Sequence, residues 1–143
     1  MKKIVLILSL VLLFSPFAFA EDRYTFYERY DLSSNALVYD RTGATSTGDV
    51  VAVFTYDKKT IFISIEEIGS TNIYYQVEGR PVGELDTWSI LDTGDIGRAS
   101  ADTSKNIAID VTELVDYLRV GLRRQGTDGT DRINVRGIFR KSN

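Results

Sequence analysis

The sequence YLRVGLRRQGTDGTDRINVRGIFRK, residues 117–141, decides the fold. Large apolar residues occupy alternate positions in both of its halves: Leu118, Val120, Leu122, Ile133, Val135 and Phe139. Side chains of a strand alternate between two faces, whereas a helix would need apolar residues at a period near 3.6. The run 125–131 between the halves holds two glycines that permit positive φ, and its Asp and Thr side chains favour a loop. The stretch therefore predicts two strands, which we expect to pair as an antiparallel hairpin.

The same alternation recurs along the rest of the chain. Further strands are expected at 21–31, 36–40, 50–56, 61–66, 73–78, 87–91 and 106–112. Turn signals separate them at intervals of about 8 to 12 residues, which is typical of a sandwich or barrel. The sequence therefore predicts an all-β protein, an antiparallel β-sandwich of jelly-roll-like type with about eight strands.

Three local features refine this prediction. Residues 49–68 are expected to form a second hairpin, and the continuous apolar run at 50–54 favours a central strand buried on both faces. Residues 92–103 form a Gly/Asp/Ser-rich loop. Residues 111–116 are expected to form one helical turn with Thr112 as its N-cap.

Residues 1–20, MKKIVLILSLVLLFSPFAFA, have the pattern of a secretory signal peptide. A basic start precedes an apolar run (4–13), and Ala18-Phe19-Ala20 supplies the small residues that a signal peptidase needs. The alternative is an uncleaved anchor, but the run is short for about 30 Å of hydrocarbon. We expect cleavage before Glu21, export to the periplasm or exterior, and no membrane span afterwards. Removing 20 of the 143 residues leaves 123, which we interpret as one domain, 21–143.

The composition excludes several chemistries. The chain has no cysteine and no histidine, so zinc sites of the usual kind and Ser-His-Asp or Cys-His nucleophiles are excluded. No phosphate-binding glycine loop or dinucleotide fingerprint is present, and nucleic acid is not an expected partner of an acidic exported protein. A carboxylate-only glycosidase stays as a less favoured alternative, because nothing in the spacing of the acids places two of them across a sugar. We expect no enzyme activity and no cofactor, and a structural calcium ion is the alternative.

Charge is distributed unevenly. The net charge is −3, and it becomes −5 once the two lysines of the signal peptide are removed. Residues 117–143 carry seven basic residues against two acids, or +5, so residues 21–116 carry −10. This asymmetry suits head-to-tail contact between copies or contact with an anionic polymer. The alternative is a solvated face whose arginines pair with neighbouring acids. The arginines expected to share this face are Arg119, Arg123, Arg136 and Arg140.

Aromatic residues give a second set of candidate ligand-binding residues. Tyr74, Trp88 and Tyr117 are candidates for a sugar-stacking platform, and the alternative places Trp88 in the core with the tyrosines half-buried. The tyrosine-rich stretch 21–31 is expected to be an ordinary terminal strand. The alternative is a segment that pairs with the sheet edge of a neighbouring subunit.

Two Asp- and Gly-containing runs are candidate calcium sites. They place Asp92 near Asp95 and Asp128 near Asp131, and calcium prefers such oxygen ligands. Neither run matches the twelve-residue helical-hand loop, and turn-forming Asp and Gly are the alternative explanation.

Two runs, YYQVEG…DTWSILDTG (74–94) and IAIDVTELVDYLRVGLRRQGTDGTDRINVRGIF (107–139), resemble the latter half of galactose-binding-domain-like (discoidin-type) jelly rolls. In this chain, as in those modules, a Trp-containing strand precedes a Tyr-Leu-Arg-Val strand, and a Gly/Thr/Asp loop leads to the closing strand. The resemblance implies an eight-stranded sandwich with a non-catalytic binding or assembly role. It transfers no ligand residue, because no ligand motif matches.

These observations predict an exported, non-catalytic structural, assembly or adhesion-type protein of the cell envelope or exterior, with self-association or an envelope protein as its partner. The alternative is a module that binds glycan or anionic polymer. The arginines, or the loops 41–48, 92–103 and 125–131, would then carry the binding.

Overall fold

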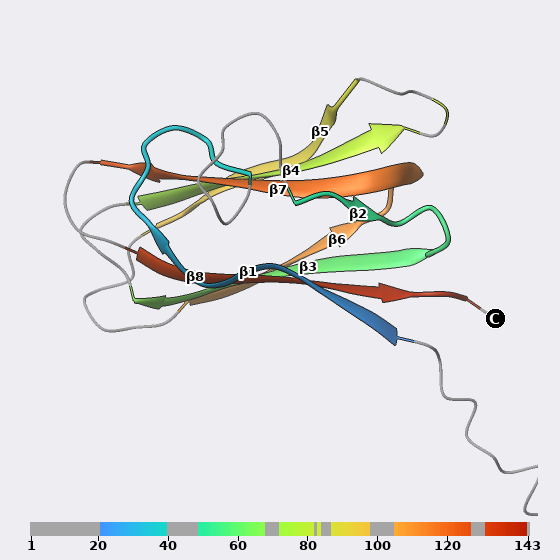
Figure 1. The fold of residues 1–143 in the computed structure, drawn as a ribbon, viewed down its shortest axis with the longest axis horizontal. Helices are drawn as coiled ribbons and strands as arrows, with labels where there is room; N and C mark the ends of the chain where they lie inside the picture. The colour runs from blue at the N-terminus through green and yellow to red at the C-terminus, as the bar shows by residue number, and fades with distance from the viewer. Residues whose placement is uncertain are drawn as a thin grey trace, which may run out of the picture.

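The computed structural model describes residues 21–39, 49–67, 72–81, 83, 87–97, 105–126 and 131–142. In these residues, eight strands form two four-stranded antiparallel sheets that pack face to face (Figure 1). The first sheet has the order β1 (Glu21–Leu32), β8 (Asp131–Arg140), β3 (Lys58–Glu67), β6 (Lys105–Val111). The second has the order β2 (Val51–Ala52), β7 (Val115–Gln125), β4 (Asn72–Pro81), β5 (Ser89–Ile96). This two-sheet, eight-stranded arrangement is a jelly roll, which confirms the predicted fold class.

The core lies between the two sheets. Both contribute alternate side chains, and the predicted inward faces of 117–141 are confirmed. Fully buried residues include Ile61, Ile63, Ile65, Leu118, Val120, Leu122, Ile133 and Val135. Most are β-branched or aliphatic, which fits the pleated, buried surface of a strand.

The predicted hairpin at 117–141 is wrong, although both of its strands exist. β7 belongs to the second sheet and β8 to the first, so the chain crosses the sandwich between them. β8 pairs instead with β1 on one side and with β3 on the other. Alternation specifies only which residues face the core. Two strands that face each other across the sandwich satisfy that pattern as well as two neighbours in one sheet.

The predicted hairpin at 49–68 is wrong for the same reason. β2 has only two residues, lies at the edge of the second sheet and pairs with β7, whereas β3 lies in the first sheet. Val50 is 39% exposed and Phe54 is 65% exposed, so this run is not a central strand buried on both faces. The chain turns at 54–57 and crosses to the other sheet.

Three further local predictions are corrected. Residues 92–96, predicted as loop, continue β5, which pairs with β4. The segment between β6 and β7 forms no helical turn, and the described residues contain no helix. The predicted strand at 36–40 is reduced in the described residues to one bridge between Val38 and Leu122.

The predicted signal peptide lies outside the described residues. Within the part of the chain that the structure describes, no helix has the length and apolarity needed to cross a membrane.

β1 is irregular, and its irregularity shapes the outer surface of the first sheet. Its register against β8 shifts between Thr25 and Tyr27 and again between Tyr27 and Tyr30. Phe26 and Tyr27 are consequently both buried, although strict alternation predicts opposite faces for them. Arg29, within the second shift, has a φ of 46°, a left-handed conformation that is uncommon outside glycine. The bulged backbone directs the Arg29 N–H towards β8.

Candidate functional site

The four arginines expected to share one face lie on two. Arg119 and Arg123 belong to β7 and point away from the core on the outer surface of the second sheet. Arg136 and Arg140 belong to β8, in the first sheet on the other side of the sandwich. The predicted single arginine face is therefore wrong, because it assumed that β7 and β8 are neighbours in one sheet.

Aromatic and arginine side chains are stacked on the outer surface of the second sheet. The Arg119 guanidinium carbon lies 4.2 Å from the ring centroids of both Tyr39 and Trp88. The Arg80 guanidinium carbon lies 4.0 Å from the Tyr117 ring and 5.9 Å from the Trp88 ring. We call this set the stacked face, and it also includes Arg123, 4.5 Å from the ring of Tyr74.

The stacked face brings the candidate residues Tyr74, Trp88 and Tyr117 onto one surface, but not as an open platform. Arginines of the same chain stack on these rings, so they compete with any sugar for the ring faces. Trp88 is half-buried in this stack, which also differs from the alternative that placed it in the core.

A buried carboxylate holds the stacked face together. Glu78 is 6% exposed and accepts hydrogen bonds from the Tyr39 hydroxyl at 2.9 Å, from Arg119 Nε and from Gln76 Nε2. The Tyr74 hydroxyl donates in turn to Gln76 Oε1 at 3.0 Å. Burial, and then the hydrogen bond to Glu78, raise the pKa of Tyr39 to about 12. These polar groups satisfy one another, so the network favours a structural role.

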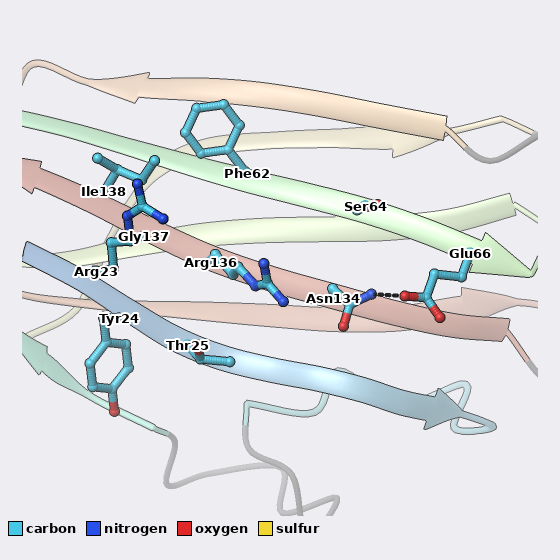
Figure 2. Close-up of a pocket in the computed structure, with 10 residues that line it drawn as sticks. All are labelled: Arg23, Tyr24, Thr25, Phe62, Ser64, Glu66, Asn134, Arg136, Gly137 and Ile138. Carbon is cyan, nitrogen blue, oxygen red and sulfur yellow. Dashed lines mark hydrogen bonds between the residues drawn. The ribbon is translucent and has the colours of Figure 1, made fainter.

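The outer surface of the first sheet carries a depression of about 570 Å³, which we call the β8 depression (Figure 2). β1, β8 and β3 form its floor, and it is open to solvent. Six of its lining residues carry the chemistry: Arg23, Phe62, Ser64, Glu66, Asn134 and Arg136. Figure 2 shows Arg136 between the Arg23 end and the Asn134–Glu66 end.

Arg136 is the cation of this depression whose side chain has no partner among the described residues. In the register of the sheet it lies between Thr25 of β1 and Phe62 of β3, and its side chain is exposed. In the part of the chain that the structure describes, the side chain of Arg136 makes no ion pair and no hydrogen bond. Its neighbours along β8 differ, since Arg132 pairs with Asp31 and Arg140 pairs with Glu21. Arg136 therefore has its full set of donors available to a ligand.

At the other end of the depression, hydrogen bonds hold the Asn134 and Glu66 side chains in one orientation. The bulge in β1 lets the Arg29 N–H donate to Asn134 Oδ1 at 2.8 Å. Asn134 is 8% exposed, and this bond directs its Nδ2 towards Glu66 Oε1, 2.6 Å away. Glu66 Oε2 lies 3.9 Å from Arg29 Nε. Glu66 is thus fixed through one oxygen and keeps acceptor capacity on the other.

The described lining residues of the β8 depression supply groups that can bind a ligand. Glu66 is the only carboxylate among the described lining residues, whereas a glycosidase needs two that face each other across the sugar. Arg136 and Arg23 supply positive charge, Phe62 supplies an apolar surface, and Ser64 supplies a hydroxyl.

Asp92, Asp95 and Asp131 are the predicted calcium ligands that the structure describes, and they are separated or engaged elsewhere. Asp92 and Asp95 pair with Val77 and Tyr74 of β4, residues that point to opposite sides of the second sheet. Asp131 is fully buried and ion-paired with Arg124, with 2.9 Å between Nε and Oδ2. Asp128 lies outside the described residues. No group of three or more acids suited to a metal occurs in the part of the chain that the structure describes.

Sequence reasoning missed most of the β8 depression. It selected Arg136 by residue type but not Phe62, Glu66 or Asn134, because β3 and β8 become neighbours only in the folded sheet. One signal was present. Phe62 occupies an outward position between the inward Ile61 and Ile63, where alternation calls for a polar residue, and it is 40% exposed.

Comparison with known proteins does not identify a family. No family model matches the chain, and no curated protein is similar to it. The resemblance to galactose-binding-domain-like modules therefore stays a prediction.

Solved structures of similar shape include three of low identity. Eiger TNF from S. frugiperda has 12% identity and a TM-score of 0.49, covering 87% of this chain and 94% of that one. A chain of infectious bursal disease virus Gx strain has 13% identity and a TM-score of 0.49, covering 87% and 32%. Tripeptidyl peptidase 2 has 11% identity and a TM-score of 0.48, covering 89% and 10%. At these values the similarity does not indicate a shared function.

Proposed function

We propose that this protein is an exported, non-catalytic binding module, and that the β8 depression binds an anionic group of a glycan or other polymer. One observation carries the proposal: Arg136 is exposed within a concave surface and has no partner among the described residues. A planar guanidinium with free donors matches carboxylate, sulfate or phosphate oxygens in a bidentate geometry.

The surroundings of Arg136 support this assignment. Arg23 adds a second guanidinium to the same depression, and its Nε donates to Glu21 at 2.9 Å while the side chain stays 79% exposed. The exposed ring of Phe62 gives a ligand apolar contact beside the charge. Combined charge and apolar contact give a site both affinity and orientation.

A matched pair of variants tests the proposal. Arg136→Gln removes the unpaired charge from the depression, and Arg123→Gln removes an exposed charge from the stacked face on the other side of the sandwich. We expect Arg136→Gln to weaken binding to an immobilised polyanion about tenfold or more, because a charge-assisted hydrogen bond is lost. Arg123→Gln should have a small effect through net charge alone. Equal effects of the two variants, or no binding by the unmodified protein, would contradict the proposal.

Self-association is a second candidate function, and a separate observation favours it. Phe54 and Leu114 are 65% and 84% exposed. Phe54 follows Val53, and Leu114 lies two residues before Asp116. The Val53 N–H donates to the Asp116 carbonyl at 2.7 Å, so the two apolar residues lie on neighbouring segments. Exposed apolar groups gathered in one place are typical of contact surfaces.

Light scattering after size-exclusion chromatography tests self-association. An oligomer that persists at high salt and dissociates when Phe54→Ser and Leu114→Ser are combined would support the apolar contact. A strict monomer at high protein concentration, at low and at high salt, would rule it out.

A further inference from the structure

We infer that the group which fits the β8 depression is a carboxylated sugar ring, of the uronic acid class, and that Glu66 selects it against sulfated or phosphorylated sugars. The inference rests on the proposed anion-binding function and adds the ligand class and a specificity-determining residue.

The depression has two chemically different ends. Arg23 and Arg136 supply positive charge, and the Asn134–Glu66 pair supplies a carboxylate at the other end, as Figure 2 shows. A ligand that carries anionic groups along its whole length would place one of them against Glu66. A ligand with one anionic group and several hydroxyls satisfies both ends.

The spacing suits one sugar ring. Arg136 and Asn134 are two positions apart on β8, which is about 7 Å along a strand. That length is comparable with a pyranose ring and its substituents. The carboxylate of a uronic acid is bonded directly to the ring, so a bidentate pair with Arg136 holds the ring above the sheet.

Phe62 supplies the surface on which such a ring would lie. It is the direct cross-strand neighbour of Arg136, so the two side chains project from adjacent points on the sheet. Its ring is 40% exposed, and no aromatic or cation–π contact within the described residues covers it. The aliphatic C–H face of a sugar packs against an exposed aromatic ring of this kind, which the stacked face does not offer.

Glu66 supplies the discrimination. Its Oε1 accepts from Asn134 Nδ2, and its Oε2 is ion-paired with the exposed Arg29, whose Nε is 3.9 Å away and too far for a hydrogen bond. Oε2 can therefore accept from a sugar hydroxyl. The same charge repels a sulfate or phosphate ester placed at that end. Asn134 acts through Glu66 as a positioning residue, because its amide holds the carboxylate in place.

The test uses three oligosaccharide probes and isothermal titration calorimetry on the purified protein. The probes are a galactose oligomer that carries one galacturonic acid ring, its methyl ester with the same hydroxyls but no charge, and a sulfated galactan oligomer. We expect the methyl ester to bind about tenfold or more weakly than the acid, because it loses the charge-assisted bond to Arg136. We expect the sulfated oligomer to bind more weakly than the carboxylated one, because Glu66 repels its sulfate groups.

Glu66→Gln then isolates the selectivity. It keeps the side-chain shape and removes the charge, so the ratio of sulfated to carboxylated binding should rise about tenfold, the scale of one like-charge contact. Glu113→Gln removes one exposed acid outside the depression and should leave that ratio unchanged.

The outcomes separate the inference from the proposed function. Equal binding of sulfated and carboxylated oligomers, with a ratio that Glu66→Gln does not change, would overturn the inference while anion binding at Arg136 stands. If neither anionic probe binds the unmodified protein, or if Arg136→Gln binds both as well as the unmodified protein does, the proposed function and the inference fail together.

Discussion

Arg124 of β7 and Asp131 of β8 form an ion pair buried between the two sheets, with 2.9 Å between Nε and Oδ2. Their side chains are 2% and 0% exposed. The pair lies where the chain crosses from the second sheet to the first, so it joins the two sheets at one end of the core.

Replacing one member of this pair should strongly destabilise the protein. We expect Asp131→Asn to lower the free energy of unfolding by about 3–5 kcal/mol, because it removes the buried countercharge of Arg124. Urea unfolding measures the loss. The double variant Arg124→Met with Asp131→Leu should lose less than the single variant. A single-variant loss below about 1 kcal/mol would show that water reaches the pair.

Tyr39 should make stability fall in alkaline solution. Its pKa is raised from 10.0 to about 12 by burial and then by the bond to Glu78, so it ionises first in the unfolded chain. Its contribution is complete below about pH 10 and is lost as pH rises towards about 12. Urea unfolding should show a shallower decline for Tyr39→Phe across this window. Some decline should remain, because the pKa values of Tyr56 and Tyr75 are also raised.

Measuring the Tyr39→Phe variant at pH 7 as well separates the loss of hydrogen bonding from the loss of the titrating hydroxyl. At pH 7 the variant reports only the lost hydrogen bonds of the hydroxyl, which donates to Glu78 and accepts from Gln76 Nε2. An alkaline decline identical to that of the unmodified protein would assign the titration to other groups.

Gly121 should not tolerate even one methyl group. A Cβ at this position would lie 2.8 Å from Tyr39 Cε1 and 3.0 Å from Leu37 Cγ, and Tyr39 is held by Glu78. We expect Gly121→Ala to lower the free energy of unfolding by about 1–3 kcal/mol through overpacking. Gly97→Ala is the control, because its nearest atom is 3.9 Å away. Equal stability of the two variants would show that the Leu37–Tyr39 segment can move off β7.

Lys59 should be replaceable by an apolar residue. It is 3% exposed, its Nζ donates to the Glu113 carbonyl at 3.3 Å, and burial lowers its pKa. Because the unfolded chain binds this proton more tightly, burial of the charge costs stability below the unfolded pKa, and the cost falls as pH rises towards it. We expect Lys59→Met to leave stability at pH 7 unchanged or to raise it by up to about 1 kcal/mol.

Thermal unfolding at pH 7 and at pH 9.5 checks this expectation. The advantage of Lys59→Met should shrink at the higher pH. A loss above about 1 kcal/mol at pH 7 would mean that the bond to Glu113 outweighs the desolvation of the ammonium group.

Local properties of the fold were predictable from the sequence. Leu118, Val120 and Leu122 face the core as expected, because the direction of a side chain in a strand follows from its position alone. Tyr27 is an exception, because the bulge in β1 buries it beside Phe26. No local sequence pattern predicts the extra residue of that bulge.

Pairing between strands was not predictable. Strands β7 and β8 are separated by a short loop, yet they lie in different sheets, and either arrangement buries the same apolar residues. For the same reason, the sequence did not show that Arg119 and Arg136 lie in different sheets. It also did not show that Phe62 and Arg136 are cross-strand neighbours. The candidate site consists of cross-strand neighbours, so its composition depends on the pairing that the sequence leaves open.

The pairing of β1 with β8 also sets the time at which this protein can fold. Among the described strands, β1 is synthesised first and β8 last. β1 cannot pair in the first sheet until β8 is made, because β8 lies between β1 and β3. Until its ten residues have left the ribosome, β1 and β3 have no strand between them. Such long-range pairing makes folding slow and places it after synthesis. The first sheet therefore cannot be completed before β8, the last of the described strands, has been synthesised.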